Sequence, residues 1–267
     1  MKKIILAMSF LFVVFILGCT KVQTDTQANT QTDAQKNTDT NQNTNQQTQV
    51  QTQGRVVFGI SDAAANMNSV TRVMVTIDKV EVHSDAKGWF EVSSEPMTYN
   101  LLELKASGKL GLLANAQLDE GNYNQIRLDI SKVMITDVQG EHDAKLPSNE
   151  LKINSDFEVK ENSTSTAAFD FAADESLHVT GNGKYIMTPV VQVDIKEDAD
   201  VNVKPDNSIE IKGGKTKGSI KVGMDLNGNV GVGIRVPADV NISIETDGLI
   251  KAKGSGKGSV GVSTDII

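Results

Sequence analysis

Apolar and polar residues alternate along much of the chain between residues 54 and 197, which is the period of a half-buried β-strand. In residues 73–82 the alternation changes phase at Asp78-Lys79, and residues 126–135 repeat the same pattern with the same change. A change of phase predicts either a bulge or a strand that passes between two sheets. The two segments therefore predict long, irregular strands of a β-sandwich.

Shorter alternating runs predict further strands at 55–61, from Trp89 onward, and at 151–153, 157–160, 167–171 and 185–193. Phe169 and Phe171 share one face, so we expect both rings in the core. Trp89 is expected as a core anchor, with stacking on a sugar ring as the alternative. Residues 101–118 are rich in leucine but contain two glycines, and we expect a loop with one helical turn. Pro189 cannot donate a ladder hydrogen bond, which predicts an edge or a bulge at that point.

The C-terminal part, residues 198–267, has a different character. It holds 12 of the 22 glycines from Gly213 onward, and its apolar residues alternate in runs at 220–226, 230–236 and 240–244. Asn-Gly at 227–228 and Asp-Gly at 247–248 are typical of tight hairpins. The pattern predicts a second β-module, an antiparallel meander with one apolar face. That face must be covered, by packing on itself, by docking on the sandwich or by a second copy of the chain.

The first residues have the layout of a secretory signal. Two lysines precede an uncharged apolar run at residues 4–17, which is shorter than the roughly 20 residues that a membrane-spanning helix needs. The following Ile16-Leu17-Gly18-Cys19 resembles the lipobox of prokaryotic lipoproteins. The resemblance implies that residues 1–18 are removed and that Cys19 carries lipid, which would hold the protein on the membrane. An uncleaved signal anchor is the alternative.

Residues 19–53 consist of this cysteine and a segment made almost wholly of Thr, Gln, Asn and Asp. Such a composition buries too little apolar surface to offset the entropy lost on ordering. We therefore expect a disordered tether between the lipid and the folded body.

Several motifs in the body occur in the order of a known family. They are GNYNQIRL at 121–128, LPS at 146–148, LKI at 151–153, FDF at 169–171 and GKY at 183–185. Over about residues 54–194 the chain resembles the domain of unknown function 4382, found in secreted and lipid-anchored prokaryotic proteins. The resemblance implies a β-sandwich of the transthyretin or prealbumin-like kind, and no established activity.

Composition excludes several classes of function. The formal net charge is −8, which argues against a nucleic-acid partner, because phosphate neutralisation needs clustered Lys and Arg. The single cysteine excludes an internal disulfide and a cysteine zinc cluster. Three histidines lie far apart in sequence and are expected at the surface or in turns. No cofactor is expected.

The candidate sites are few. Asp170, Asp174 and Glu175 carry oxygen ligands that suit calcium, although a solvated acidic loop is the stronger interpretation. Asn162 and Asn241 stand in glycosylation sequons, which matter only in a host with that machinery. Three lysines near the C-terminus are candidates for contact with an acidic envelope polymer: Lys251, Lys253 and Lys257.

Together these patterns predict an all-β protein, lipid-anchored to the cell membrane and facing outside the cytoplasm. We expect no enzymatic activity but a binding or structural role at the cell envelope, with an envelope polymer or a surface protein as partner. One alternative is a surface component that self-assembles into homo-oligomers through the C-terminal sheet. The other is an envelope hydrolase that uses paired carboxylates, whose separation the sequence does not give.

Overall fold

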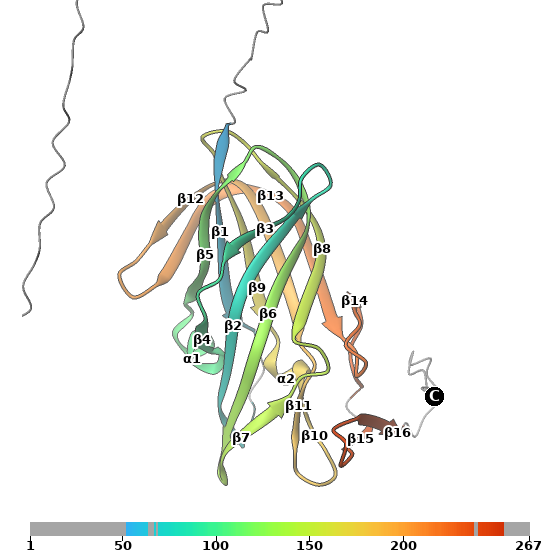
Figure 1. The fold of residues 1–267 in the computed structure, drawn as a ribbon. Coiled ribbons are helices and arrows are strands. Elements are labelled where there is room, and N and C mark those ends of the chain that lie inside the picture. Colours follow the sequence, from blue (N-terminus) through green and yellow to red (C-terminus); the bar gives the residue numbers. More distant parts are fainter. Residues whose placement is uncertain (1–51, 64–66, 68, 238–239, 254–267) are drawn as a thin grey trace, which may run out of the picture. The chain divides into compact units, whose positions relative to one another are not determined.

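The computed structural model describes residues 52–63, 67, 69–237 and 240–253. These residues form an all-β structure in which two sheets pack face to face (Figure 1). Within these ranges no helix combines the length and the apolar character needed to cross a membrane. The predicted signal peptide at 1–18, the lipidation candidate Cys19, residues 19–51 of the predicted tether and Lys257 lie outside the described residues. Gln53, the last residue of the predicted tether, is the first residue of β1.

The first sheet contains six strands in the order β12-β9-β1-β5-β13-β14, and β12 also pairs with β13. Strand β1 runs parallel to β9 and antiparallel to β5, so the sheet is mixed. The bounds are β1 (Gln53–Asp62), β5 (Leu110–Asp119), β9 (Thr164–Phe171), β12 (Val190–Val203), β13 (Ser208–Met224) and β14 (Val230–Val232).

The second sheet contains eight strands and is built around the long pair β2 and β6. Its main order is β10-β11-β7-β6-β2-β3, with β4 on β2 and β8 on β6. The bounds are β2 (Val70–Ser84), β3 (Gly88–Ser93), β4 (Met97–Asn100), β6 (Gly121–Asp137), β7 (Gly140–Lys145), β8 (Glu150–Val159), β10 (Leu177–Val179) and β11 (Tyr185–Met187). Two short helices, α1 (Leu101–Ser107) and α2 (Ala173–Ser176), complete the sandwich, and β15 (Asn241–Ile244) pairs with β16 (Ile250–Lys253) in a separate hairpin.

The core lies between the two sheets and is filled by the inward faces of their strands. Phe169 and Phe171 are both fully buried there, as predicted. Phe58 stacks against Phe169 with ring centroids 6.1 Å apart, and Phe157 stacks against Tyr123 at 5.2 Å. The aromatic residues of the family-like motifs are therefore packing residues.

The change of phase in β2 and β6 is a pair of facing bulges. Thr76 pairs with Lys132 and Ile77 with Ile130, which leaves Ser131 extra on β6. Lys79 then pairs with Asp129, which leaves Asp78 extra on β2. The two extra residues bond to each other, since Ser131 Oγ donates to Asp78 Oδ1 at 2.7 Å. Residues on both sides of the bulge face the same core, and the strands stay in one sheet. The bulge prediction is confirmed, and the alternative of a strand passing between sheets is wrong.

The ribbon formed by β12 and β13 bends sharply in its middle. Asp198, Gly213 and Gly214 there have φ values of +54°, +58° and +80°, a left-handed geometry that favours glycine. Beyond the bend, residues 199–213, which we call the flap, fold over the outer face of the six-stranded sheet and reach β5, where Ile209 pairs with Leu110.

A second small core lies beneath the flap. Val57, on the outer face of β1, is fully buried against Val201 and Ile209 of the flap, with Leu110 packed beside them. A β-carbon on Gly59 would lie 2.7 Å from Leu110 Cγ and 2.8 Å from Ile209 Cδ1. Glycine at position 59 is therefore what lets these side chains approach the backbone of β1.

Three sequence-based expectations need correction. Residues 110–119 form strand β5 inside the first sheet, although we predicted a loop there. Residues 185–193 divide into β11 and the start of β12, and Pro189 lies between the two strands. The predicted boundary between residues 197 and 198 falls inside β12, and β13 and β14 belong to the first sheet rather than to a separate meander. Alternation identifies which face of a strand is buried but not which strand lies beside it.

Candidate functional site

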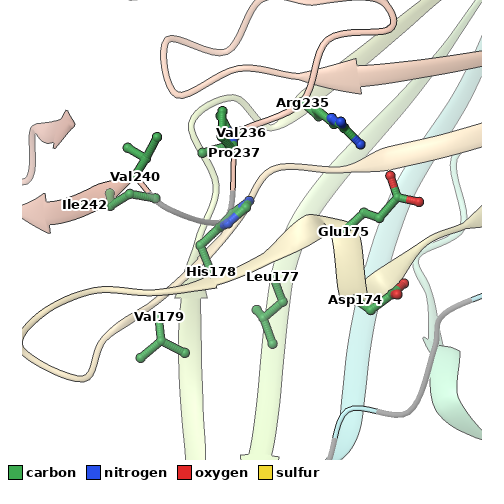
Figure 2. Close-up of a pocket in the computed structure, with 10 residues that line it drawn as sticks. All are labelled: Asp174, Glu175, Leu177, His178, Val179, Arg235, Val236, Pro237, Val240 and Ile242. Atoms are coloured by element: carbon green, nitrogen blue, oxygen red, sulfur yellow. The ribbon is translucent and has the colours of Figure 1, made fainter. Parts of the chain in front are cut away.

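A cavity of about 500 Å³ lies where α2 and β10 meet the chain between β14 and β15 (Figure 2). Its apolar lining residues are Leu177, Val179, Val236, Pro237, Val240 and Ile242. Its polar lining residues are Asp174, Glu175, His178 and Arg235. Side chains that are far apart in sequence thus surround one space, as expected of a ligand site.

Two buried polar residues fix the single turn of α2. The Asp62 carboxylate accepts a hydrogen bond from the Ala173 backbone N–H at 3.1 Å. Ser176 Oγ donates to the Ala172 carbonyl at 2.6 Å and accepts from the Val190 N–H at 2.8 Å. These bonds tie α2 to β1 and to β12, and so they position the two acidic residues of the turn at the cavity.

His178 is the one titratable ring at the cavity. Its Nε2 lies 2.8 Å from Oγ1 of Thr188, a residue with no exposed surface. Burial lowers the pKa of His178 below its ordinary value, so the ring is neutral at pH 7. Because Nε2 is engaged with an inaccessible hydroxyl, this histidine is arranged to support the cavity wall.

Of the charged groups at the rim of the cavity, one forms an ion pair within the described part of the chain and two do not. Glu175 Oε1 lies 2.6 Å from Lys221 Nζ and is therefore neutralised. Asp174 and Arg235 are exposed, and neither has an ion-pair partner within 4 Å among the described residues. An apolar floor with one free group of each sign at its rim suits a ligand that is part apolar and part polar.

The acidic residues proposed from the sequence do not form one cluster. Asp174 and Glu175 line the cavity, but Asp170 lies on β9 and accepts a hydrogen bond from Ser61 Oγ at 2.8 Å. Across the described ranges, no three His, Cys, Asp or Glu side chains are grouped so that they would hold a metal ion.

The other candidate residues lie apart from the cavity lining. Asn162 stands in the turn between β8 and β9 with φ of +56°, and Asn241 is exposed at the start of β15. Lys251 lies 3.1 Å from Glu245, whereas Lys253 is exposed on β16.

Trp89 is not the core anchor that we predicted. It lies half-buried on the second sheet, with the Arg127 guanidinium 4.0 Å from its ring centroid and His83 at 5.0 Å. Arg127 also reaches Glu81 and Glu150, each at 3.3 Å. The cation covers the indole ring, so this cluster is a cross-strand network that stabilises the sheet rather than an open platform for a sugar.

Sequence reasoning missed Arg235 and the cavity itself. Arg235 follows the short strand β14 and has no neighbour in sequence that signals a site. The cavity forms from two segments about 60 residues apart, and only the fold brings them together.

Comparison with known families gives one match. The family model described as "Domain of unknown function (DUF4382)" matches residues 53–189, which is more than half of the 267 residues. Comparison with curated proteins and with solved structures gave no match, so the prealbumin-like topology stays a prediction. The described fold begins at the same point as the matched segment, with β1 at Gln53. This chain belongs to the family that carries the domain of unknown function DUF4382.

Proposed function

We propose that this protein is a lipid-anchored component of the cell envelope, facing outside the cytoplasm, with a non-catalytic binding role. The observation that carries the binding role is the cavity lined by α2, β10 and residues 235–242. The anchor is argued from the sequence alone, in which the chain's single cysteine follows a short apolar run.

The place of the cavity in the fold supports this proposal. Three of its lining residues belong to β10, and the β10–β11 hairpin lies at the opposite end of the sandwich from the start of β1 (Figure 1). Val179 of its lining is 61% exposed. Exposed apolar side chains beside a cavity are typical of interaction sites.

The chemistry at the cavity favours binding over hydrolysis. Hydrolysis by carboxylates needs two acids that face one reacting bond. Here Glu175 is ion-paired and Asp170 does not line the cavity. The free rim charges and the apolar floor are suited to hold a ligand in one orientation.

Two experiments test the proposal. Replacing Cys19 by serine should move the protein from the membrane fraction to the soluble fraction on cell fractionation. Membrane retention of the C19S protein would contradict the lipid anchor.

For the binding role, the full-length protein in detergent serves as bait for envelope extracts, with identification of what is retained. Arg235→Glu should abolish retention of a specific component, whereas Lys184→Glu, the same charge change on an exposed residue outside the cavity lining, should not. Retention that is identical in wild type and R235E would refute the role of the cavity.

A further inference from the structure

The flap borders an open groove that is separate from the end cavity. A groove of about 420 Å³ lies between the flap, the outer face of β9 and β12, and the start of β5. Because Ile209 is buried against Val57 and paired with β5, the flap is fixed over this groove. The groove is therefore a permanent feature of the fold.

Three lysines line the groove: Lys109 from the segment before β5, Lys196 from β12 and Lys204 from the flap tip. Lys109 lies 2.8 Å from Asp206 and closes the flap tip onto β5. Lys196 and Lys204 have no carboxylate within 4 Å anywhere in the described part of the chain. Two ammonium groups thus remain available on a protein whose net charge is −8.

The two carboxylates that line the groove are engaged elsewhere. Asp194 Oδ1 accepts hydrogen bonds from Ser219 and Gln192 on the same face. Glu210 lies 3.4 Å from Lys212. The charge of Glu210 is offset by Lys212, whereas Asp194 keeps its negative charge because its partners are uncharged. Lys196 and Lys204 therefore outnumber the one uncompensated carboxylate of the described lining, and the excess positive charge favours an anion.

An independent observation comes from Thr166 on β9. Its side chain lines the groove and is 2% exposed, and its Oγ1 has no hydrogen-bond partner among the described residues. A buried hydroxyl without a partner costs free energy, and an acceptor placed in the groove would remove that cost.

We propose that this groove binds a phosphate group, with Lys196 and Lys204 as cationic donors and Thr166 as a neutral donor. Lysine binds phosphate as a point charge, and phosphate oxygens accept several hydrogen bonds from different directions. The phosphate can belong to an anionic envelope polymer or to a small molecule. This site replaces the C-terminal lysines as the place where an acidic polymer would be held, and it is independent of the end cavity.

Calorimetric titration of the full-length protein in detergent tests the proposal. The probes are inorganic phosphate, a soluble poly(glycerol phosphate) and poly-glutamate as a carboxylate polymer of similar charge. Lys196→Ala combined with Lys204→Ala should weaken binding of the phosphate-bearing probes by about tenfold or more. Lys215→Ala combined with Lys253→Ala removes two exposed lysines that do not line the groove and should change it by less than about twofold.

Thr166→Val separates a specific site from general charge attraction. It should weaken phosphate binding several-fold while the melting temperature stays the same or rises, since a buried unpaired hydroxyl is replaced by a methyl group. Binding of inorganic phosphate would assign a small-molecule site, and binding of the polymer alone would assign a polymer site.

The proposal would be overturned if both double-lysine variants lost the same amount of affinity for the phosphate-bearing probes. It would also be overturned if poly-glutamate bound as tightly as poly(glycerol phosphate), or if T166V bound phosphate as tightly as the wild type. The proposal would also be overturned if neither inorganic phosphate nor poly(glycerol phosphate) bound at millimolar concentration. Retention of envelope components through Arg235 is unaffected by any of these results, so the two proposals fail separately.

Discussion

Replacing Ile209 by alanine should release the flap while the sandwich stays folded. Ile209 is 5% exposed and belongs to the small core beneath the flap with Val57 and Val201. Truncating a buried isoleucine to alanine costs about 2–5 kcal/mol, because apolar contacts are lost and a cavity is left. The other attachments of the flap tip are weaker. The Lys109–Asp206 ion pair has half-exposed side chains, and pairs of this kind contribute about 0.2–1 kcal/mol.

Hydrogen exchange measured by mass spectrometry gives the test. A loss of 2 kcal/mol in the free energy of local opening corresponds to an exchange rate about thirty times faster. Peptides from residues 199–213 should show this acceleration in I209A, whereas peptides from β2 and β6 should keep wild-type rates. Lys215→Ala, an exposed change in the same ribbon, should leave the flap unaffected. Wild-type exchange of the flap in I209A, or equal acceleration in β2 and β6, would refute the argument that this core fixes the flap.

Three further changes test other parts of the structure. In a urea titration, Gly59→Ala should lower the free energy of unfolding by about 1–3 kcal/mol, because its β-carbon would collide with side chains beneath the flap. Gly218→Ala is the control and should leave the free energy of unfolding unchanged, because a β-carbon at residue 218 would have no neighbour within 4 Å. His178 has a pKa lowered by burial, so the folded state binds fewer protons than the unfolded state below about pH 6.5, and stability is lost as the pH falls from 7 to 5. His178→Gln should lose less stability over that interval, and an equal loss would show that this ring is not responsible. Arg127→Ala should destabilise by about 1–2 kcal/mol in thermal unfolding, more than Trp89→Phe, because it removes the guanidinium that joins Glu81, Glu150 and the Trp89 ring and leaves each glutamate with only a lysine as ion-pair partner among the described residues.

The long strands could be predicted because their apolar and polar residues alternate strongly. Their bulges could be predicted because the alternation changes phase at the same point in both strands. The facing bulges at Asp78 and Ser131 appear in the sequence as two identical changes of phase. Residues 110–119 were missed because their apolar residues do not alternate regularly. The first half of β5 is covered on both faces, by the flap at Leu110 and Leu112 and by the main core at Leu113 and Ala114, and the register shifts there opposite Gly59. A strand segment of this kind loses the period of two.

The sequence singled out Asp174 and Glu175, which line the end cavity, but it indicated neither that cavity nor the groove. The lysines that line the groove come from three separate segments of the chain. Its Thr166 differs from other threonines only in that its buried hydroxyl has no hydrogen-bond partner among the described residues, which the sequence does not show. The environment of Trp89 was mispredicted for the same reason, because the guanidinium that covers its ring belongs to Arg127, 38 positions later in the sequence. Such contacts depend on strand register, which local patterns do not specify.

The position of β12 has a consequence for how the matched segment of this chain is completed. The matched family segment ends at residue 189, and β12 begins at Val190 and pairs with β9 from Phe171 to Thr166. A chain that stopped at residue 189 would leave one side of β9 as an open edge, with its backbone donors and acceptors ready to accept another strand. Residues 53–189 of this chain are therefore an incomplete sheet on their own. The following strand β12 covers the open side of β9, so the sheet of this protein is completed by residues that lie beyond the matched segment.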